Sequence, residues 1–275
     1  MKLASVYGTE DTIAPVFGAK GDPNSIFPLL KECGYQAIEP FIRDPNQIDR
    51  LAFEKAVNRF GLDIAAIGTG PVVSDDGLTF TNSNPDIRRA AVNRVKDIVN
   101  FSLLFGAPIN IGKLRGDIDE NQPHQSWKWM RECLLDVCEH ANKNGINIMI
   151  EPQNRKNINN LNTALETIEF IEVIGIPNLY LMLDIFHMSF EDNAISSKLI
   201  KVKDKLLHLH LADSNRWAPG KGEFDFVTVV ETLKLIEYDQ YLSMEVGYEK
   251  ERYEEAKMSA RFLGNILNYK QTMGG

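Results

Sequence analysis

LLHLHLAD (206–213) is an apolar segment of the length of a buried strand, and its His208 and His210 have the alternating spacing that places two side chains on one face. Three further segments share its character, because each is apolar and carries a carboxylate near its end. They are NIMIEP (147–152) with Glu151, LYLMLDIFH (179–187) with Asp184, and YLSMEVG (241–247) with Glu245. Their spacing is about 30 residues, that of consecutive βαβ units, which return the chain to the same end of a parallel sheet.

The alternation of strand and helix patterns extends over the whole chain. We expect strands at residues 2–8, 35–41, 63–70, 108–114, 147–152, 179–187, 206–213 and 241–247. We expect helices at residues 24–33, 48–60, 85–105, 124–144, 162–174, 194–204, 226–237 and 250–268. Eight βα pairs without a break in composition predict an α/β protein, a single-domain (β/α)8 TIM barrel over residues 1–275, in preference to a doubly wound open sheet.

Composition narrows the class of protein. The formal net charge of −8 argues against a nucleic-acid partner, because such binding depends on Lys and Arg that neutralise phosphates. No apolar run approaches the ~18 residues of a membrane span, and the N-terminal segment lacks the pattern of a signal peptide. Three cysteines without zinc-like spacing are typical of reduced thiols in a cytoplasmic protein. We therefore expect a cytoplasmic protein without a membrane partner.

The carboxyl ends of barrel strands meet at one mouth, so the four segments bring Glu151, Asp184, His210 and Glu245 together there. Taken singly, each acidic residue could cap a helix or pair with a lysine. Taken together, crowded carboxylates repel one another, and a divalent cation removes this electrostatic repulsion. Three carboxylates and one imidazole suit Mn²⁺, Mg²⁺ or Co²⁺ better than structural zinc. The pattern predicts a metal-dependent barrel enzyme.

Other polar residues lie near the same predicted strand ends. His187 follows Asp184 by three residues, and Arg216 lies in the loop ADSNRWAPGKGEFDF (212–226). Lys113 and Arg115, in IGKLRG (111–116), are candidates for holding a phosphate or hydroxyl, or are solvated loop charges. PGKG (219–222) lacks the full phosphate-loop motif and is interpreted as a turn. His208 is expected to be a satisfied core residue.

Four motifs together resemble the sugar phosphate isomerase/epimerase superfamily of xylose-isomerase-like barrels, and within it the ketose 3-epimerases of the D-tagatose and D-psicose group. They are IEPQNR (150–155), LDIFHM (183–188), HLHLADSNRWAPGKGEFDF (208–226) and MEVG (244–247). The resemblance covers mainly residues 105–250. It implies a sugar or sugar-phosphate substrate and a homodimer or homotetramer.

The resemblance also implies roles for individual residues. Glu151, Asp184, His210 and Glu245 would bind one divalent metal, usually Mn²⁺. Glu151 and Glu245 would act as two bases that invert C3 through an enediolate. His187 and Arg216 match positions that contact the substrate carbonyl region, and we expect further substrate contacts from Tyr7, Glu39, Lys113 and Arg115.

This sequence departs from the epimerase pattern at two places. Asn157 stands where those enzymes carry a further glutamate, and their tryptophan-rich stretch after the first strand is absent, with only Tyr7 suggestive. Aldose–ketose isomerases, hydroxypyruvate isomerase and inosose dehydratase use the same scaffold and remain alternatives. An endonuclease IV-like DNA-repair enzyme, which needs a histidine-rich trinuclear zinc site, and a non-catalytic sugar-binding barrel are more distant alternatives.

Overall fold

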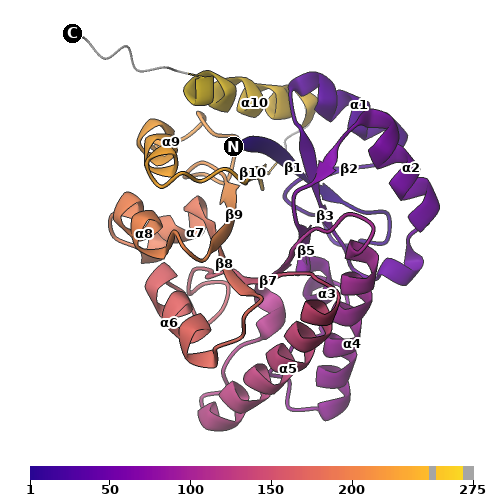
Figure 1. Ribbon diagram of the computed structural model, residues 1–275, viewed down its shortest axis with the longest axis vertical. Coiled ribbons are helices and arrows are strands. Elements are labelled where there is room, and N and C mark those ends of the chain that lie inside the picture. The colour runs from indigo at the N-terminus through magenta and orange to yellow at the C-terminus, as the bar shows by residue number, and fades with distance from the viewer. Residues whose placement is uncertain (248–251, 269–275) are drawn as a thin grey trace.

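A closed barrel of parallel strands forms the centre of the molecule in the computed structural model, which describes residues 1–247 and 252–268. Strand β1 pairs with both β10 and β3, and this double pairing closes the sheet. All strand pairs are parallel, as predicted for a TIM barrel (Figure 1). The barrel strands are β1 (Lys2–Gly8), β3 (Ala37–Phe41), β5 (Ile67–Gly68), β6 (Ile109–Ile111), β7 (Ile148–Ile150), β8 (Leu179–Asp184), β9 (Leu206–Leu211) and β10 (Tyr241–Met244). The short strands β2 (Ala19–Lys20) and β4 (Asp63–Ile64) pair beside β1 and β3.

Helices form a ring around the strands (Figure 1). They are α1 (Pro23–Cys33), α2 (Arg50–Phe60), α3 (Gly70–Ser74), α4 (Pro85–Ser102), α5 (Pro123–Lys143), α6 (Ala164–Ile174), α7 (Ile185–Glu191), α8 (Ile195–Val202), α9 (Phe226–Leu235) and α10 (Arg252–Asn268). Two 3₁₀ turns, η1 (Pro45–Gln47) and η2 (Lys113–Arg115), lie between them. The eight predicted helices are present, while the short α3 and α7 were not predicted. Residues 250 and 251 of the last predicted helix lie outside the described residues. No helix in the described part of the chain is long and apolar enough to cross a membrane.

Seven of the eight predicted strands are shorter in the structure, and only β1 keeps its predicted bounds. Three of the seven show why a strand ends or divides. The predicted strand 179–187 was too long, because Asp184 ends β8 and caps α7: its Oδ1 accepts a hydrogen bond from the Phe186 N–H at 2.9 Å. The predicted strand 108–114 stops at Ile111, before η2. The predicted strand 63–70 is divided into β4 and β5, and α3 begins at Gly70 with Pro71 in its first turn.

The apolar core lies mainly between the strands and the helix ring, and Tyr7 belongs to it. Tyr7 is buried against Phe27 of α1 and Phe53 of α2, with ring centroids 5.0 and 6.5 Å away. Its hydroxyl donates to the Gly21 carbonyl oxygen at 2.6 Å. The expectation that Tyr7 contacts substrate was wrong, because neighbouring residues of a strand face opposite sides and Tyr7 faces the helices.

Candidate metal centre and substrate pocket

Four strand ends bring Glu151, Asp184, His210 and Glu245 together at the mouth of the barrel. Asp184 is paired with His210 in the register of β8 and β9, while Glu151 and Glu245 each follow the last residue of their strand, β7 and β10. One possible ligand atom from each residue lies within 4.8 Å of the others. The predicted cluster of three carboxylates and one imidazole is therefore assembled.

The environment of Glu151 fits a cation at this cluster. Its Oε2 accepts hydrogen bonds from Asn110 Nδ2 at 3.1 Å and Gln153 Nε2 at 2.8 Å. Its Oε1 is buried without a hydrogen-bond partner in the described residues and lies 4.0 Å from His210 Nδ1. Burial raises the pKa of Glu151, and the neighbouring Glu245 and Asp184 carboxylates raise it further. A divalent cation would satisfy the free oxygen and remove this repulsion.

Glu39 orients the imidazole of the cluster. The Nε2 of His210 lies 3.0 Å from both Glu39 oxygens, and its Nδ1 lies 3.0 Å from Glu245 Oε2. His208, on the same face of β9, places its Nε2 2.8 Å from Glu39 Oε2. Burial alone would raise the pKa of Glu39, but the two histidines hold it below its ordinary value. A carboxylate on the far nitrogen directs the other nitrogen of a metal-binding histidine at the metal.

This placement corrects the role expected for Glu39. The residue is fully buried beneath the cluster and is absent from the lining of the cavity, so it supports His210 instead of touching substrate. His208 is a satisfied core residue, as expected.

Arg216 bridges two of the cluster carboxylates. Its guanidinium donates to Asp184 Oδ2 and Glu245 Oε2, and it lies over the rings of Phe186 and Phe17 at 4.6 and 5.2 Å. Burial alone would raise the pKa of Asp184, but Arg216 and the nearby histidines hold it below its ordinary value. Arg216 has a left-handed backbone, with φ of 65°, a conformation that is costly for a residue with a side chain. The surrounding loop must therefore hold it in place.

Asp213 organises that loop. Its buried carboxylate accepts hydrogen bonds from three backbone N–H groups, those of Ser214 at 2.8 Å, Gly220 at 2.8 Å and Phe224 at 3.1 Å. Gly222 permits this closeness, because a Cβ there would lie 2.3 Å from Asp213 Oδ1. The segment that resembles a phosphate loop thus binds a carboxylate of its own chain and is a turn, as interpreted from the sequence.

His187 is held by an asparagine that sequence reasoning missed. Asn154 Nδ2 lies 2.8 Å from His187 Nδ1, and Asn154 Oδ1 accepts from the Lys156 N–H at 3.1 Å. The second contact fixes the orientation of the amide, so Asn154 donates to Nδ1 and the ring proton of a neutral His187 lies on Nε2. That Nε2 is 3.8 Å from Asp184 Oδ2. The signal for Asn154 was its place three residues after Glu151 in IEPQNR.

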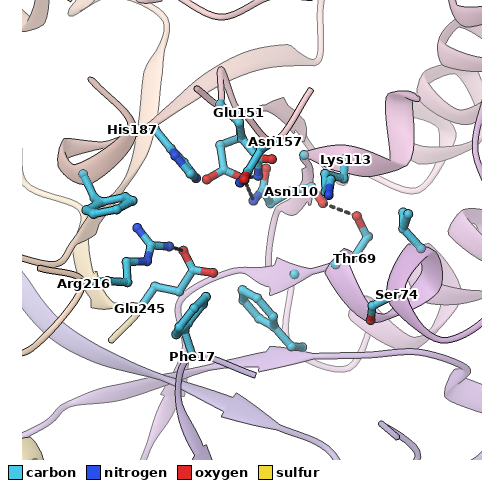
Figure 2. Close-up of a pocket in the computed structure, with 17 residues that line it drawn as sticks. Phe17, Thr69, Ser74, Asn110, Lys113, Glu151, Asn157, His187, Arg216 and Glu245 are labelled. Carbon is cyan, nitrogen blue, oxygen red and sulfur yellow. Dashed lines mark hydrogen bonds and ion pairs between the residues drawn. The ribbon is translucent and has the colours of Figure 1, made fainter. Parts of the chain in front are cut away.

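A cavity of about 420 Å³ opens beside the cluster (Figure 2). His187, Arg216 and Glu245 lie on one side of it, together with the ring of Phe17. Residues that carry amides, hydroxyls and one amine line the other side: Asn110, Asn157, Thr69, Ser74 and Lys113. Glu151 joins the two sides, because Asn110 and Gln153 both donate hydrogen bonds to it.

Arg115 was a candidate for phosphate binding, and the structure corrects that expectation. The residue is fully buried, and its guanidinium donates five hydrogen bonds within the protein. Their acceptors are Asn160 Oδ1 and the carbonyl oxygens of Gly112, Glu151, Asn160 and Leu161. Burial lowers the pKa of Arg115 to about 10, which still leaves it charged at neutral pH. Lys113 is exposed at the edge of the cavity and remains a candidate.

Arg115→Met is therefore expected to destabilise the fold. It leaves buried carbonyl oxygens without donors, at a cost of about 1–3 kcal/mol for each unsatisfied group. We expect the free energy of unfolding, measured in urea, to fall by about 3 kcal/mol or more. Lys113→Met in the same turn is the matched control and is expected to change it by less than ~0.5 kcal/mol. Equal stabilities of the two variants would contradict a structural role for Arg115.

Comparisons with known proteins identify the family of this barrel. A family model described as xylose isomerase-like TIM barrel matches residues 27–266. The chain belongs to that family. It is 27% identical over 208 residues to an L-ribulose 3-epimerase of Methylomonas sp. (strain DH-1), covering 74% of this chain and 71% of that protein. An L-ribulose 3-epimerase of Mesorhizobium japonicum is 27% identical over 226 residues, covering 78% and 72%.

A solved structure shows the same fold. The D-psicose 3-epimerase of Clostridium cellulolyticum H10, determined with D-tagatose, superposes with a TM-score of 0.82 at 22% identity. The alignment covers 98% of this chain and all of that one. The family model confirms the family predicted from the four motifs, and the superposition confirms the barrel.

Proposed function

We propose that this protein is a divalent-metal-dependent ketose 3-epimerase. The observation that carries the proposal is the placement of two carboxylates, Glu151 and Glu245, on opposite sides of one cavity and in one ligand cluster (Figure 2). Inversion of a carbon centre by proton transfer needs one group to remove a proton and another to return it from the opposite face. The names of the L-ribulose and D-psicose 3-epimerase relatives support the same reaction.

The four residues of the cluster have the central part in this proposal. Glu151, Asp184, His210 and Glu245 would hold Mn²⁺, Mg²⁺ or Co²⁺. The cation, when bound, supplies a Lewis acid that polarises the substrate carbonyl and acidifies the neighbouring C–H bond. One glutamate takes the C3 proton, and the other delivers a proton to the opposite face of C3.

His187 and Arg216 would stabilise negative charge that develops on the substrate oxygens. The contact with Asn154 leaves the His187 Nε2 proton free to point into the cavity, and the guanidinium of Arg216 is held between two rings beside the cluster. Preorganised donors of this kind stabilise an oxyanion without reorganisation during the reaction. Phe17 and Phe186 line the cavity beside Arg216.

The test is deuterium incorporation followed by NMR. Purified, Mn²⁺-loaded protein is incubated in D₂O with L-ribulose, D-psicose, D-tagatose and D-fructose, and with ketose phosphates. We expect deuterium at C3 together with the inverted product. Exchange at C1 or C2 with formation of an aldose would show an aldose–ketose isomerase on the same site. No exchange with any sugar would contradict the proposal and favour a dehydratase or a binding protein.

A phosphorylated substrate is tested at Lys113. The lysine is exposed at the edge of the cavity, on the side that Thr69 and Ser74 also line. If the substrate carries a phosphate there, Lys113→Met should raise KM for the ketose phosphate about tenfold, the value of one charge-assisted hydrogen bond. KM for the unphosphorylated ketose should change little. Lys203→Met, on the exposed surface after α8, controls for loss of one positive charge. Equal KM changes for both sugars would exclude a phosphate contact.

A further inference from the structure

Two amide side chains hold one of the proposed bases. Asn110 lies in β6 and Gln153 lies just beyond β7, and both donate to the same oxygen of Glu151, at 3.1 and 2.8 Å. Figure 2 shows Asn110 beside Glu151 at the upper wall of the cavity. Both amides also line the cavity. Neither residue carries a charge, so no charge pattern in the sequence pointed to them.

The carboxylate dictates how the two amides are oriented. A carboxylate oxygen accepts hydrogen bonds only, so each amide must turn its NH₂ group toward Glu151 and its carbonyl oxygen away from it. Asn110 Oδ1 and Gln153 Oε1 are consequently buried without hydrogen-bond partners among the described residues. A buried amide oxygen that lacks a donor costs about 1–3 kcal/mol, so these two acceptors are poised to receive donors from a ligand.

The backbone at Gly112 leaves room for these two amide–carboxylate contacts but not for a side chain of its own. A Cβ at Gly112 would lie 2.7 Å from Gln153 Nε2 and 2.7 Å from Glu151 Oε2. Glycine at this position therefore allows the amide and the carboxylate to meet directly beneath the cavity. The contact is also supported from behind, because Arg115 donates to the carbonyl oxygens of Gly112 and Glu151, both at 2.8 Å.

We propose that Asn110 and Gln153 form an amide clamp with two tasks. As positioning residues they hold Glu151 Oε2, so that Oε1 stays directed at the ligand cluster. As specificity residues they accept hydrogen bonds from hydroxyl groups of the substrate through Asn110 Oδ1 and Gln153 Oε1. The clamp therefore selects a polyhydroxylated sugar over its deoxy analogue. The second task rests on the proposed epimerase function, whereas the first does not.

The positioning task is tested with Mn²⁺ alone, by titration calorimetry in the absence of sugar. Gln153→Met keeps the length of the side chain and removes the amide, and Asn110→Leu keeps the approximate shape. Each variant is expected to bind Mn²⁺ about tenfold more weakly, the lower end of the effect of removing a group that orients a metal ligand. Gln125→Leu, on α5 outside the barrel, is the matched control and should bind as the wild type does. Unchanged affinity in both clamp variants would overturn the positioning task.

The specificity task is tested by a cycle of protein and substrate changes. The best ketose of the D₂O panel and its single deoxy analogues are compared by kcat/KM in the wild type, Gln153→Met and Asn110→Leu. We expect one or more deoxy analogues to be about 10–100-fold poorer for the wild type, because they leave an amide oxygen unpaired. In the matching clamp variant that factor should fall to within about threefold.

The outcomes of these experiments distinguish a failure of the specificity task from a failure of the proposed epimerase function. If wild-type protein is active and every deoxy penalty persists in both clamp variants, the specificity task is wrong and the epimerase function stands. If the wild type converts no sugar, the epimerase function and the specificity task fail together. The Mn²⁺ titration then decides whether the clamp positions Glu151.

Discussion

Glu151→Gln and Glu245→Gln are each expected to lower kcat for epimerisation by about 10⁴-fold, the upper end of the contribution of one acid–base group. Glutamine keeps the shape of the side chain and an oxygen toward the cluster, but it does not accept a proton at neutral pH. In the proposed mechanism each face of C3 has one glutamate, so neither residue replaces the other. Formation of the inverted product should therefore be lost in either variant, while the remaining glutamate can still exchange the C3 proton of the epimer that it faces.

The fold and the bound metal must be controlled in this experiment, since both glutamates are also candidate ligands. Thermal unfolding and elemental analysis of each variant, loaded with excess Mn²⁺, separate loss of a base from loss of the cation. Glu169→Gln, on the exposed surface of α6, is the matched control and should retain full turnover. Near-normal turnover in Glu151→Gln or Glu245→Gln would show that the two-base mechanism is wrong.

The cluster was predictable from sequence because its four residues lie at the ends of successive strands of the βα repeat. Parallel strands separated by one helix return to the same end of the sheet, so Glu151, Asp184, His210 and Glu245 had to meet at one mouth. The roles expected for His187 and Arg216 came instead from the resemblance to the epimerases. Element boundaries were less predictable, because Asp184 serves both as a cluster residue and as the N-cap of α7, and a cap interaction is decided by local geometry.

The supporting residues could not be predicted in the same way. Lys113 and Arg115 are two positions apart in one motif, and only the turn η2 determines that the arginine is buried while the lysine is exposed. Glu39 has the chemistry of a substrate contact, but the strand register sets it below His210 instead of beside the cavity. The amides of Asn110 and Gln153 carry neither charge nor periodicity, so only their distances to Glu151 identify them.

Removal of the metal is expected to abolish turnover. Three carboxylates are packed around one imidazole, and Arg216 offsets the repulsion between two of them, Asp184 and Glu245. Dialysis against EDTA should reduce epimerisation to background, and Mn²⁺, Co²⁺ or Mg²⁺ should restore it, in an order that identifies the preferred ion. Retained turnover in protein shown by elemental analysis to be metal-free would contradict a metal-dependent reaction.

The same ion should stabilise the fold, which gives a readout independent of catalysis. A cation that binds only the folded state at 100 times its Kd contributes about 2.7 kcal/mol, measurable as a higher Tm. Asp184→Asn is the informative variant, because asparagine still caps α7 but offers the cluster no charge. We expect Mn²⁺ to raise the Tm of the wild type and to leave that of Asp184→Asn nearly unchanged. An equal rise of Tm in both proteins would show that Mn²⁺ binds elsewhere. The proposed site has three negative charges, and one of them is the fully buried Asp184. Its affinity for Mn²⁺ must fall when that charge is removed.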